Sequence, residues 1–364
     1  MGLSDILILG YYGFKNSGDE ALLLSMIQQL RKQDSSLKIT VLSENPKETS
    51  QIYKVKAVKR DNPVSLLTQL MTCKMLVVGG GTLIQDKTST KSLIYYLTVI
   101  RFAQLFGKKV MLYANGIGPL SYENTEKTVK ILNEVNLITL RDEMAFEELK
   151  RLGINKPEIK LCADSVFGLD YDKKCDISGL LEKIGVPKGR KYFCVSVRDS
   201  SPEELEKTIM TACDYISARY DLMPVFIPFQ KKKDYEITER IVKGMVKKAV
   251  ILDVECTISE MMGVISSSEL VIGMRLHSLI YSAVSCVPFI GLVYDPKVKG
   301  FVEYLDKGVC VDAERTCSAE LEDLGDYCMK NSEKMRSDLA KACAEMKKKS
   351  EENAKAALKL LRSR

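Results

Sequence analysis

The sequence has a single histidine among 364 residues, and none of its cysteines form a C-x-x-C pair. Structural and catalytic zinc sites need clustered histidine or cysteine ligands, so these two absences argue against a zinc site. The eleven cysteines are scattered, and most lie inside apolar runs, which is typical of reduced thiols in a cytosolic protein rather than of a disulfide framework. We therefore expect no metal and no cofactor.

Long hydrophobic runs are also missing. No apolar run approaches the roughly 18 to 20 residues that a membrane-spanning helix needs. The first run, residues 5–10, has the pattern of a buried strand rather than of a signal peptide. With 46% hydrophobic and 28% charged residues, the composition is that of an ordinary globular chain, and we expect a cytoplasmic protein.

What the sequence does have is a regular alternation of strand and helix patterns. A polar passage at residues 169–190 separates two halves that each show this alternation. The pattern predicts an α/β fold of two doubly wound Rossmann-like domains with a cleft between them. We place the domains at residues 1–170 and 171–315, and expect the C-terminal helices, 316–364, to pack back on the body. The predicted strands are 5–10, 38–43, 75–81, 109–113, 137–140, 191–197, 223–228, 250–252, 269–272 and 287–293.

Three glycine-rich turns follow predicted strands in the first half. Residues 10–20 have neither the dinucleotide-binding spacing nor that of a P-loop, but their glycines would let the backbone approach a ligand. Asp19 and Glu20 follow at the start of a helix, where an acidic residue is also favourable for the helix alone. The glycines at 79–81 indicate unusual backbone dihedrals or a bare backbone, and a tight turn is the alternative. The turn at 115–119 is similar and less specific.

Charged residues follow strands as well. Arg141 stands at the end of a predicted strand, where its planar fork suits a carboxylate or a phosphate. A pair with Asp142 or Glu143 is an equally good interpretation, and the residues alone leave both open. Asp164 ends another apolar run and could point into the cleft.

The single histidine, His277, lies in the stretch 271–283, two residues after Arg275, where a strand gives way to a helix. Only histidine has an unperturbed pKa near neutrality, although a histidine satisfied inside a strand-to-helix corner is the plain alternative. Helix N-terminal amides beside an arginine make an anion site, and Lys297 follows the next strand. Because a doubly wound fold builds its site at strand carboxyl ends, the pattern indicates a small, highly anionic ligand and one acid-base histidine.

The motifs together resemble the polysaccharide pyruvyltransferase family, most closely its bacterial CsaB type. The resemblance covers the chain in order from about residue 6 to 300, and the tail after about residue 315 has no matching motif. One departure is Lys15, where the family more often has a small residue. The matching motifs lie at residues 10–20, 78–82, 115–119, 140–142, 163–164, 273–278 and 294–297.

The resemblance implies a glycosyltransferase-B-like fold. It also implies transfer of pyruvate from phosphoenolpyruvate to a sugar as a 4,6-ketal, with release of phosphate. The implied acceptor is N-acetylmannosamine on a lipid-linked precursor of a cell-wall polysaccharide of the kind that anchors an S-layer. It also implies that the first domain takes the acceptor and the second phosphoenolpyruvate. The resemblance implies Arg275 and His277 as site residues, and our hypothesis is that His277 acts as general acid/base. Asp19 or Glu20 is the expected base on the acceptor hydroxyl, with Asp19 as the first choice. The implied substrate-binding residues are Arg141, Arg275, Lys297, Gly79, Gly80, Gly81, Asn16, Asn115 and Asp164.

Two other functions remain open at this point: a glycosyltransferase that uses a nucleotide sugar, and a non-catalytic scaffold of a polymer-assembly complex. The C-terminal tail is basic, because residues 331–364 contain ten Lys/Arg against five Asp/Glu and so carry +5 of the net charge of +6. We expect this tail to pack against the protein. Contact with the inner face of an anionic membrane, where a lipid-linked acceptor would lie, is the second interpretation. No nucleic-acid partner is expected.

Overall fold

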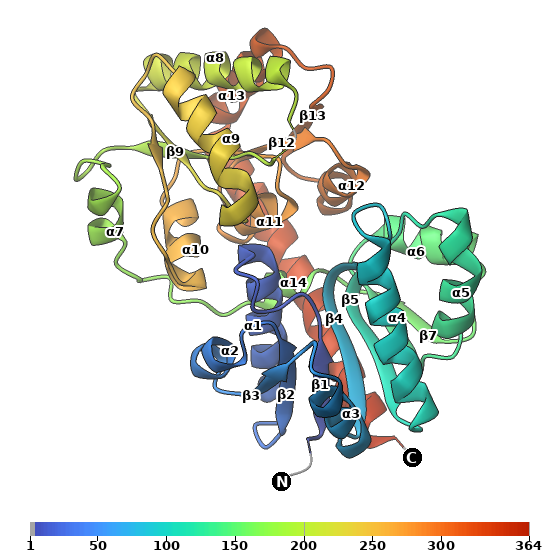
Figure 1. The fold of residues 1–364 in the computed structure, drawn as a ribbon. Coiled ribbons are helices and arrows are strands. Elements are labelled where there is room, and N and C mark those ends of the chain that lie inside the picture. Colours follow the sequence, from blue (N-terminus) through green and yellow to red (C-terminus); the bar gives the residue numbers. More distant parts are fainter. Residues whose placement is uncertain (1–3, 200, 364) are drawn as a thin grey trace. The chain divides into compact units, whose positions relative to one another are not determined.

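The computed structural model describes residues 4–199 and 201–363 (Figure 1). These residues divide into two compact units. The first unit runs to Asp170 and includes the C-terminal stretch from Met346, and the second unit comprises Tyr171–Glu345. None of the helices in the described residues combines the length and the hydrophobicity that a membrane span requires.

The first unit is built on a parallel sheet of seven described strands in the order β3-β2-β1-β4-β5-β6-β7. Alternate residues of β1 belong to two different hydrophobic clusters, with Leu7 and Leu9 on one side and Ile6 and Ile8 on the other. Both faces of the sheet are therefore covered, as its uninterrupted apolar strands require. The strands are β1 (Ile6–Leu9), β2 (Ile39–Ser43), β3 (Lys56–Lys59), β4 (Met75–Ile84), β5 (Lys109–Ile117), β6 (Leu137–Leu140) and β7 (Glu158–Leu161).

The helices of the first unit begin with recognisable capping residues. Asn16, Asn62, Ser89 and Asp142 each accept a backbone N–H of the first turn that would otherwise have no partner. The helices are α1 (Ser17–Gln33), α2 (Pro46–Tyr53), α3 (Pro63–Thr72), α4 (Thr90–Leu105), α5 (Tyr122–Leu132), α6 (Glu143–Arg151) and the short 3-10 helix η1 (Ser165–Gly168).

The second unit repeats the arrangement on a parallel sheet of six described strands in the order β10-β9-β8-β11-β12-β13. Its strands are β8 (Tyr192–Ser196), β9 (Met223–Phe226), β10 (Val250–Ile251), β11 (Val271–Gly273), β12 (Phe289–Val293) and β13 (Val309–Asp312). Its helices are α7 (Ser178–Lys183), α8 (Glu203–Tyr220), α9 (Lys231–Gly244), α10 (Ile258–Ser266), α11 (Leu276–Val284), α12 (Pro296–Leu305) and α13 (Ser318–Lys330).

The last helix, α14 (Ser332–Arg362), is drawn in red in Figure 1 and contributes residues to both units. Ala354, Ala357 and Leu358 are buried in the hydrophobic cluster of the first unit that also contains α1. Asn353 is fully buried and donates a hydrogen bond to the backbone oxygen of Ala163 at 3.0 Å. The last part of α14 is therefore part of the first unit's core.

Each sheet has one place where the strand order reverses, so that the connections after the two neighbouring strands lead to opposite sides of the sheet. In the first unit this switch point lies between β1 and β4, and in the second it lies between β8 and β11. At such a point the loops after the two strands diverge and leave room for a ligand at the carboxyl edge. The loops to inspect for a site are therefore those after β1, β4, β8 and β11.

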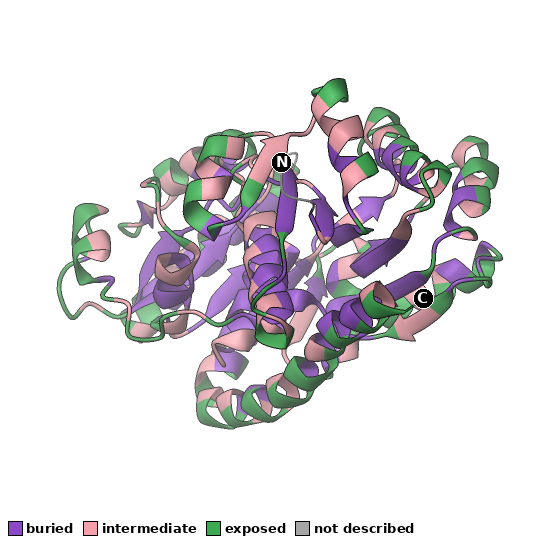
Figure 2. Cartoon of the chain, turned by 90° about the horizontal axis from the view of Figure 1, so that it is seen from below, coloured by how far each residue is buried: buried purple, intermediate pink, exposed green. Residues whose placement is uncertain are grey.

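The predicted fold class, two Rossmann-like α/β domains followed by C-terminal helices, is confirmed. Two strands are longer than predicted: β4 continues through its three glycines to Ile84, and β5 continues to Ile117. Strands β3, β7 and β13 were not predicted. Figure 2 shows the central strands buried, in purple, and the outer sides of the helices exposed, in green.

Candidate functional site

In the second unit, four residues with charged or aromatic side chains follow neighbouring strands. Arg198 comes two residues after β8, Arg275 two residues after β11, and Tyr294 and Lys297 follow β12. Strands β8, β11 and β12 are adjacent in the sheet, and the first two flank its switch point. Because parallel strands end at the same edge, the sequence brings these side chains together.

Arg275 is held by a buried carboxylate. Its Nε donates to Asp234 Oδ2 at 3.0 Å, and its Nη2 donates to the other oxygen of the same carboxylate. Asp234 is fully buried, whereas 17% of the Arg275 side chain is exposed. Asp234 also accepts the backbone N–H of Gln230, and so fixes the first turn of α9. The positive charge of Arg275 is therefore compensated by Asp234, and the Nε–Nη2 edge of its guanidinium is occupied.

Arg198 is placed by an aromatic ring. Its guanidinium carbon lies 4.5 Å from the centroid of the Tyr294 ring, and Lys297 Nζ lies 5.8 Å from the same centroid. Asp199 Oδ1 lies 3.5 Å from Arg198 Nε and 3.6 Å from Arg275 Nη2. The carboxylate of Asp199 and the ring of Tyr294 thus link three cations in one continuous group.

His277 is the second residue of α11, and Arg275 is the residue that precedes this helix. The imidazole is half-buried, and its ring centroid lies 6.5 Å from that of Tyr281 at an angle of 64°. The helix begins here because β11 ends at Gly273 and the following residues, Leu276–Val284, are strongly apolar. The single histidine is thereby placed at the carboxyl edge of the sheet, beside the strand end that carries Arg275.

In the first unit, Arg141 lies almost buried among polar groups. Its Nε donates to Asp142 Oδ2 at 3.2 Å, its Nη1 to Asp164 Oδ2 at 3.4 Å and its Nη2 to Thr82 Oγ1 at 3.0 Å. A Cβ at Gly116 would lie 2.7 Å from Thr82 Oγ1 and 3.1 Å from Arg141 Nη2, so this glycine makes room for the arginine. The ion pair of Arg141 with Asp142, which the sequence left open, is present. Arg141 also forms an ion pair with Asp164, which was not predicted.

The loop after β1 ends at Asn16, and Asp19 and Glu20 lie in the first turn of the helix α1 that follows. Asn16 caps α1 by accepting the Gly18 N–H at 3.2 Å. Glu20 accepts the Gly13 N–H at 2.8 Å and the Tyr53 hydroxyl at 2.6 Å, and burial raises the pKa of its carboxyl above the usual range. Of the two acidic residues, Asp19 is the one whose carboxylate approaches the glycines of β4.

These three glycines, Gly79, Gly80 and Gly81, lie within β4 rather than in a turn. Gly80 and Gly81 have φ of +65° and +74°, as the prediction of unusual dihedrals required. A Cβ at Gly79 would lie 2.1 Å from the Met26 methyl, and one at Gly81 would lie 3.4 Å from Asp19 Oδ1. The bare backbone thus lets α1 pack closely on the strand and brings Asp19 next to it.

Two further predicted residues are deeply buried. Asn115 is 0% exposed and donates from its amide to the backbone oxygens of Val78 and Tyr113. Asp164 is 3% exposed and accepts the Val166 N–H at the start of η1, in addition to its contact with Arg141. Both side chains hold neighbouring backbone in place.

An aromatic group at the same edge of the first unit was not predicted. The rings of Tyr11 and Phe14 are stacked, with centroids 4.0 Å apart and planes 6° apart. Arg60 lies 5.2 Å from the Phe14 ring and 4.5 Å from the Tyr95 ring, and donates to the Gly10 backbone oxygen at 3.0 Å. Stacked rings that are half-buried present an apolar face beside polar groups.

The structure therefore gathers the predicted residues into two groups, one in each unit. Arg275, His277 and Lys297 lie at one edge of the second sheet, and Arg141 contacts Asp164 in the first. The residues that sequence reasoning missed are Arg198, Asp199, Asp234, Tyr294 and Thr82. Arg198 carried a usable signal, because it follows a predicted strand as Arg141 and Arg275 do. No signal in the sequence indicated the pairing of Asp234 with Arg275, because 41 residues separate the two.

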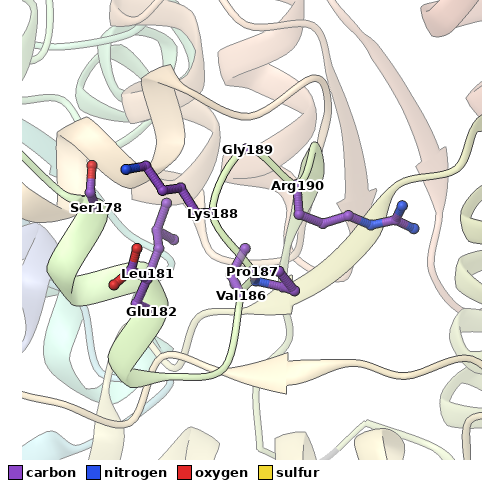
Figure 3. Close-up of a pocket in the computed structure, with 8 residues that line it drawn as sticks. All are labelled: Ser178, Leu181, Glu182, Val186, Pro187, Lys188, Gly189 and Arg190. Carbon is purple, nitrogen blue, oxygen red and sulfur yellow. The ribbon is translucent and has the colours of Figure 1, made fainter.

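A small surface hollow in the second unit contains none of these residues (Figure 3). It lies between α7 and the turn at residues 186–190. Arg190 lines it, with a side chain that extends away from α7 in Figure 3 and pairs with Asp221 through two hydrogen bonds of 2.7 Å. This hollow lies beside the amino end of β8, whereas Arg198 follows the carboxyl end of the same strand.

Comparison by sequence gives one family match: residues 16–296 match the family model described as polysaccharide pyruvyl transferase. The matched range includes every predicted site residue except Lys297, which lies one residue beyond it. No curated protein sequence matches the chain significantly.

Comparison by structure gives many similar folds at low sequence identity. A glycosyltransferase from Rickettsia africae has a TM-score of 0.68 at 11% identity, with 100% of both chains covered. HepE from Anabaena, in complex with UDP and glucose, has a TM-score of 0.65 at 13% identity, with 98% of this chain and 99% of that chain covered. MnaA from S. aureus, in complex with UDP, has a TM-score of 0.68 at 12% identity, with 98% and 96% covered. These similarities establish the glycosyltransferase-B-like fold.

Proposed function

Since the chain belongs to the polysaccharide pyruvyl transferase family, we propose that it moves a pyruvyl group from phosphoenolpyruvate onto two hydroxyls of a saccharide. The product is a ketal, and phosphate is released. The observation that carries the proposal is the group of cations with one histidine at the edge of β8, β11 and β12. A donor with a carboxylate and a phosphate needs such cations, and the reaction needs a proton carrier.

The reaction balances without an outside reagent. One saccharide hydroxyl attacks the central carbon of phosphoenolpyruvate while a proton is delivered to the methylene carbon, which becomes a methyl group. The second hydroxyl then attacks the same carbon and displaces phosphate, whose oxygen takes the remaining proton. Two carbon–oxygen bonds, one carbon–hydrogen bond and one phosphate O–H bond are formed. They replace the two hydroxyl O–H bonds, the carbon–oxygen bond to phosphate and the π bond of the carbon–carbon double bond.

We assign the proton step to His277, because an imidazole can both give and take a proton near neutral pH. Arg275 and Lys297 supply the positive charge that the donor's carboxylate and phosphate require, without acting as acids. Arg141 is the corresponding candidate in the first unit, where Thr82 and the two carboxylates hold its guanidinium in one orientation.

The acceptor is proposed to bind at the carboxyl edge of the first sheet, near the β1–β4 switch point. Asp19 is the candidate base for the attacking hydroxyl, because its carboxylate lies beside the bare backbone of Gly81. The stacked pair of Tyr11 and Phe14 offers an apolar face for a sugar ring, and Asn16 and the glycines of β4 offer polar backbone and side-chain groups. N-acetylmannosamine on a lipid-linked cell-wall precursor, pyruvylated at O4 and O6, is the acceptor that we propose.

The rival enzyme is a glycosyltransferase with a nucleotide-sugar donor. The pyruvyltransferase and the glycosyltransferase are distinguished by which donor raises the melting temperature of the protein when it binds. We expect a shift with phosphoenolpyruvate and none with UDP-glucose, and the reverse would favour the glycosyltransferase.

The assay of function is phosphate release from phosphoenolpyruvate against a panel of lipid-linked or aryl-linked saccharides. We expect release that depends on one class of saccharide and that matches the ketal formed, by mass. A chain that binds phosphoenolpyruvate but releases no phosphate with any acceptor would support the scaffold function instead.

A further inference from the structure

Arg198 has a geometry that leaves its hydrogen-bonding edge available. Its guanidinium carbon lies 4.5 Å from the centroid of the Tyr294 ring, a distance typical of a cation held over an aromatic face. A guanidinium has five N–H donors in a planar fork, and contact through its face leaves these donors for a partner in the plane. The ring therefore holds the Arg198 guanidinium in place without using its hydrogen-bond donors.

Those donors are not taken up elsewhere in the part of the chain that the structure describes. The Arg198 side chain donates no hydrogen bond to a described residue, and its Nε is shielded from solvent without an acceptor. The nearest carboxylate oxygen, Asp199 Oδ1, lies 3.5 Å away and itself makes no hydrogen bond with a described group. A buried or half-buried N–H without an acceptor is costly, so a site of this kind favours an incoming oxyanion.

The other cations of the group are less suited to a planar anion. The fork of Arg275 is already occupied by both oxygens of Asp234. Lys297 is a point charge without a fork, and lies 5.8 Å from the same Tyr294 ring as Arg198. Arg198 is thus the member of the group with an open fork, beside a lysine that adds a second positive charge.

We propose that Arg198 is a donor-binding residue, whose guanidinium edge takes two oxygens of an oxyanionic group of phosphoenolpyruvate. The location supports this assignment, because Arg198 and Arg275 follow the two strands that flank the switch point of the second sheet. The inference rests on the proposed function for the identity of the donor. Oxyanion binding by Arg198 itself rests on the geometry alone.

The test is binding of three probes to the full-length protein by isothermal titration calorimetry. The probes are phosphoenolpyruvate, inorganic phosphate and pyruvate, and the variants are R198M and R198K. We expect R198M to weaken phosphoenolpyruvate about 10- to 100-fold, the loss usual for hydrogen bonds to a charged group. R198K should lose less, because it keeps the charge and loses the fork. A selective loss of pyruvate or of phosphate tells which group of the donor Arg198 holds.

The matched control is R190M. Arg190 flanks the same strand at its amino end and is held by Asp221 on the surface, so its loss should leave probe affinities unchanged. Equal affinities in wild type and R198M would overturn the inference. If R198M does not fold, R198K and Y294L, which removes the supporting ring, answer the same question.

The two proposals fail in different ways. Suppose that wild type binds phosphate but not phosphoenolpyruvate, and that R198M no longer binds phosphate. This result contradicts the proposed donor, but supports the oxyanion site at Arg198. If wild type and R198M bind phosphoenolpyruvate with equal affinity, the proposed donor stands and the role of Arg198 is contradicted. A wild-type protein that binds none of the three probes contradicts both.

Discussion

The arginines of the candidate site differ in what already holds them. Arg141 contacts Asp142 and Asp164, and Arg275 contacts Asp234. Arg198 lies over the aromatic ring of Tyr294. The sequence predicts where Arg141 and Arg275 stand, because each follows an apolar strand. It does not predict their carboxylate partners, since Asp164 and Asp234 come from distant parts of the chain and meet the arginines only in the folded sheet.

The role of His277 is tested by H277Q, which keeps a polar side chain of similar size. We expect kcat to fall by about 10²- to 10⁴-fold, the usual contribution of a general acid or base, while the affinity for phosphoenolpyruvate stays the same. The measurements are phosphate release and calorimetric binding on the same sample. Near wild-type turnover would remove His277 from the mechanism.

The buried pair of Arg275 and Asp234 should matter for stability as well as for the site. D234N leaves a largely buried guanidinium without its counter-charge, and we expect it to lower the free energy of unfolding by about 3 kcal/mol. The control is D221N, because Asp221 pairs with Arg190 and its side chain is 85% exposed. That surface pair should contribute less than about 1 kcal/mol. Similar losses in urea denaturation of the two variants would contradict the difference in burial.

At the scale of elements, the strands missed by sequence analysis share a position. β3, β7 and β13 all lie at the edge of a sheet and consist mostly of exposed or half-buried residues, whereas the central strands are almost entirely buried. An edge strand covers less core, so its sequence lacks the apolar run that identified the central strands. Arg141 and Arg275 could be located from the sequence because each follows a strand in the interior of its sheet.

The glycines of β4 allow a test with a matched pair. Gly81 and Gly153 have φ of +74° and +73°, but a Cβ at Gly81 would meet Asp19 Oδ1 at 3.4 Å, whereas one at Gly153 would meet nothing within 4 Å. G81A and G153A should each cost about 1 kcal/mol of stability, because alanine is strained at positive φ.

Only G81A should also change turnover, because it alone places a methyl group against the proposed acceptor base. We expect its KM for the saccharide to rise while its affinity for phosphoenolpyruvate stays the same. Equal turnover in the two variants, after correction for the fraction folded, would mean that the glycines of β4 serve packing alone.

At the scale of the whole molecule, residues far apart in the chain complete the first unit. The sequence predicted two similar halves and a C-terminal helical segment that packs back. It could not predict that α14 would be divided at Met346 between the two units, because the apolar stripe along a helix does not say which core it joins. The buried alanines of its last part show that packing is one role of this segment.

Packing of the tail is tested by A357D and K348Q. Ala357 is 0% exposed, so a carboxylate there would lie without a partner in an apolar core, and we expect a loss of about 4 kcal/mol or more. Lys348 is exposed, so K348Q should leave the melting temperature unchanged. If K348Q and a matching substitution of Lys347 also leave liposome binding unchanged, the basic surface has no membrane role.

The central claim is pyruvyl transfer, and it is tested most directly by running the reaction in D₂O with phosphoenolpyruvate and a saccharide acceptor. The account predicts a ketal whose methyl group carries one deuterium from solvent, with one phosphate released for each ketal formed. Mass spectrometry of the product and a phosphate assay give both quantities. Consumption of a nucleotide sugar in place of phosphoenolpyruvate, or a product without the deuterated methyl group, would contradict the account.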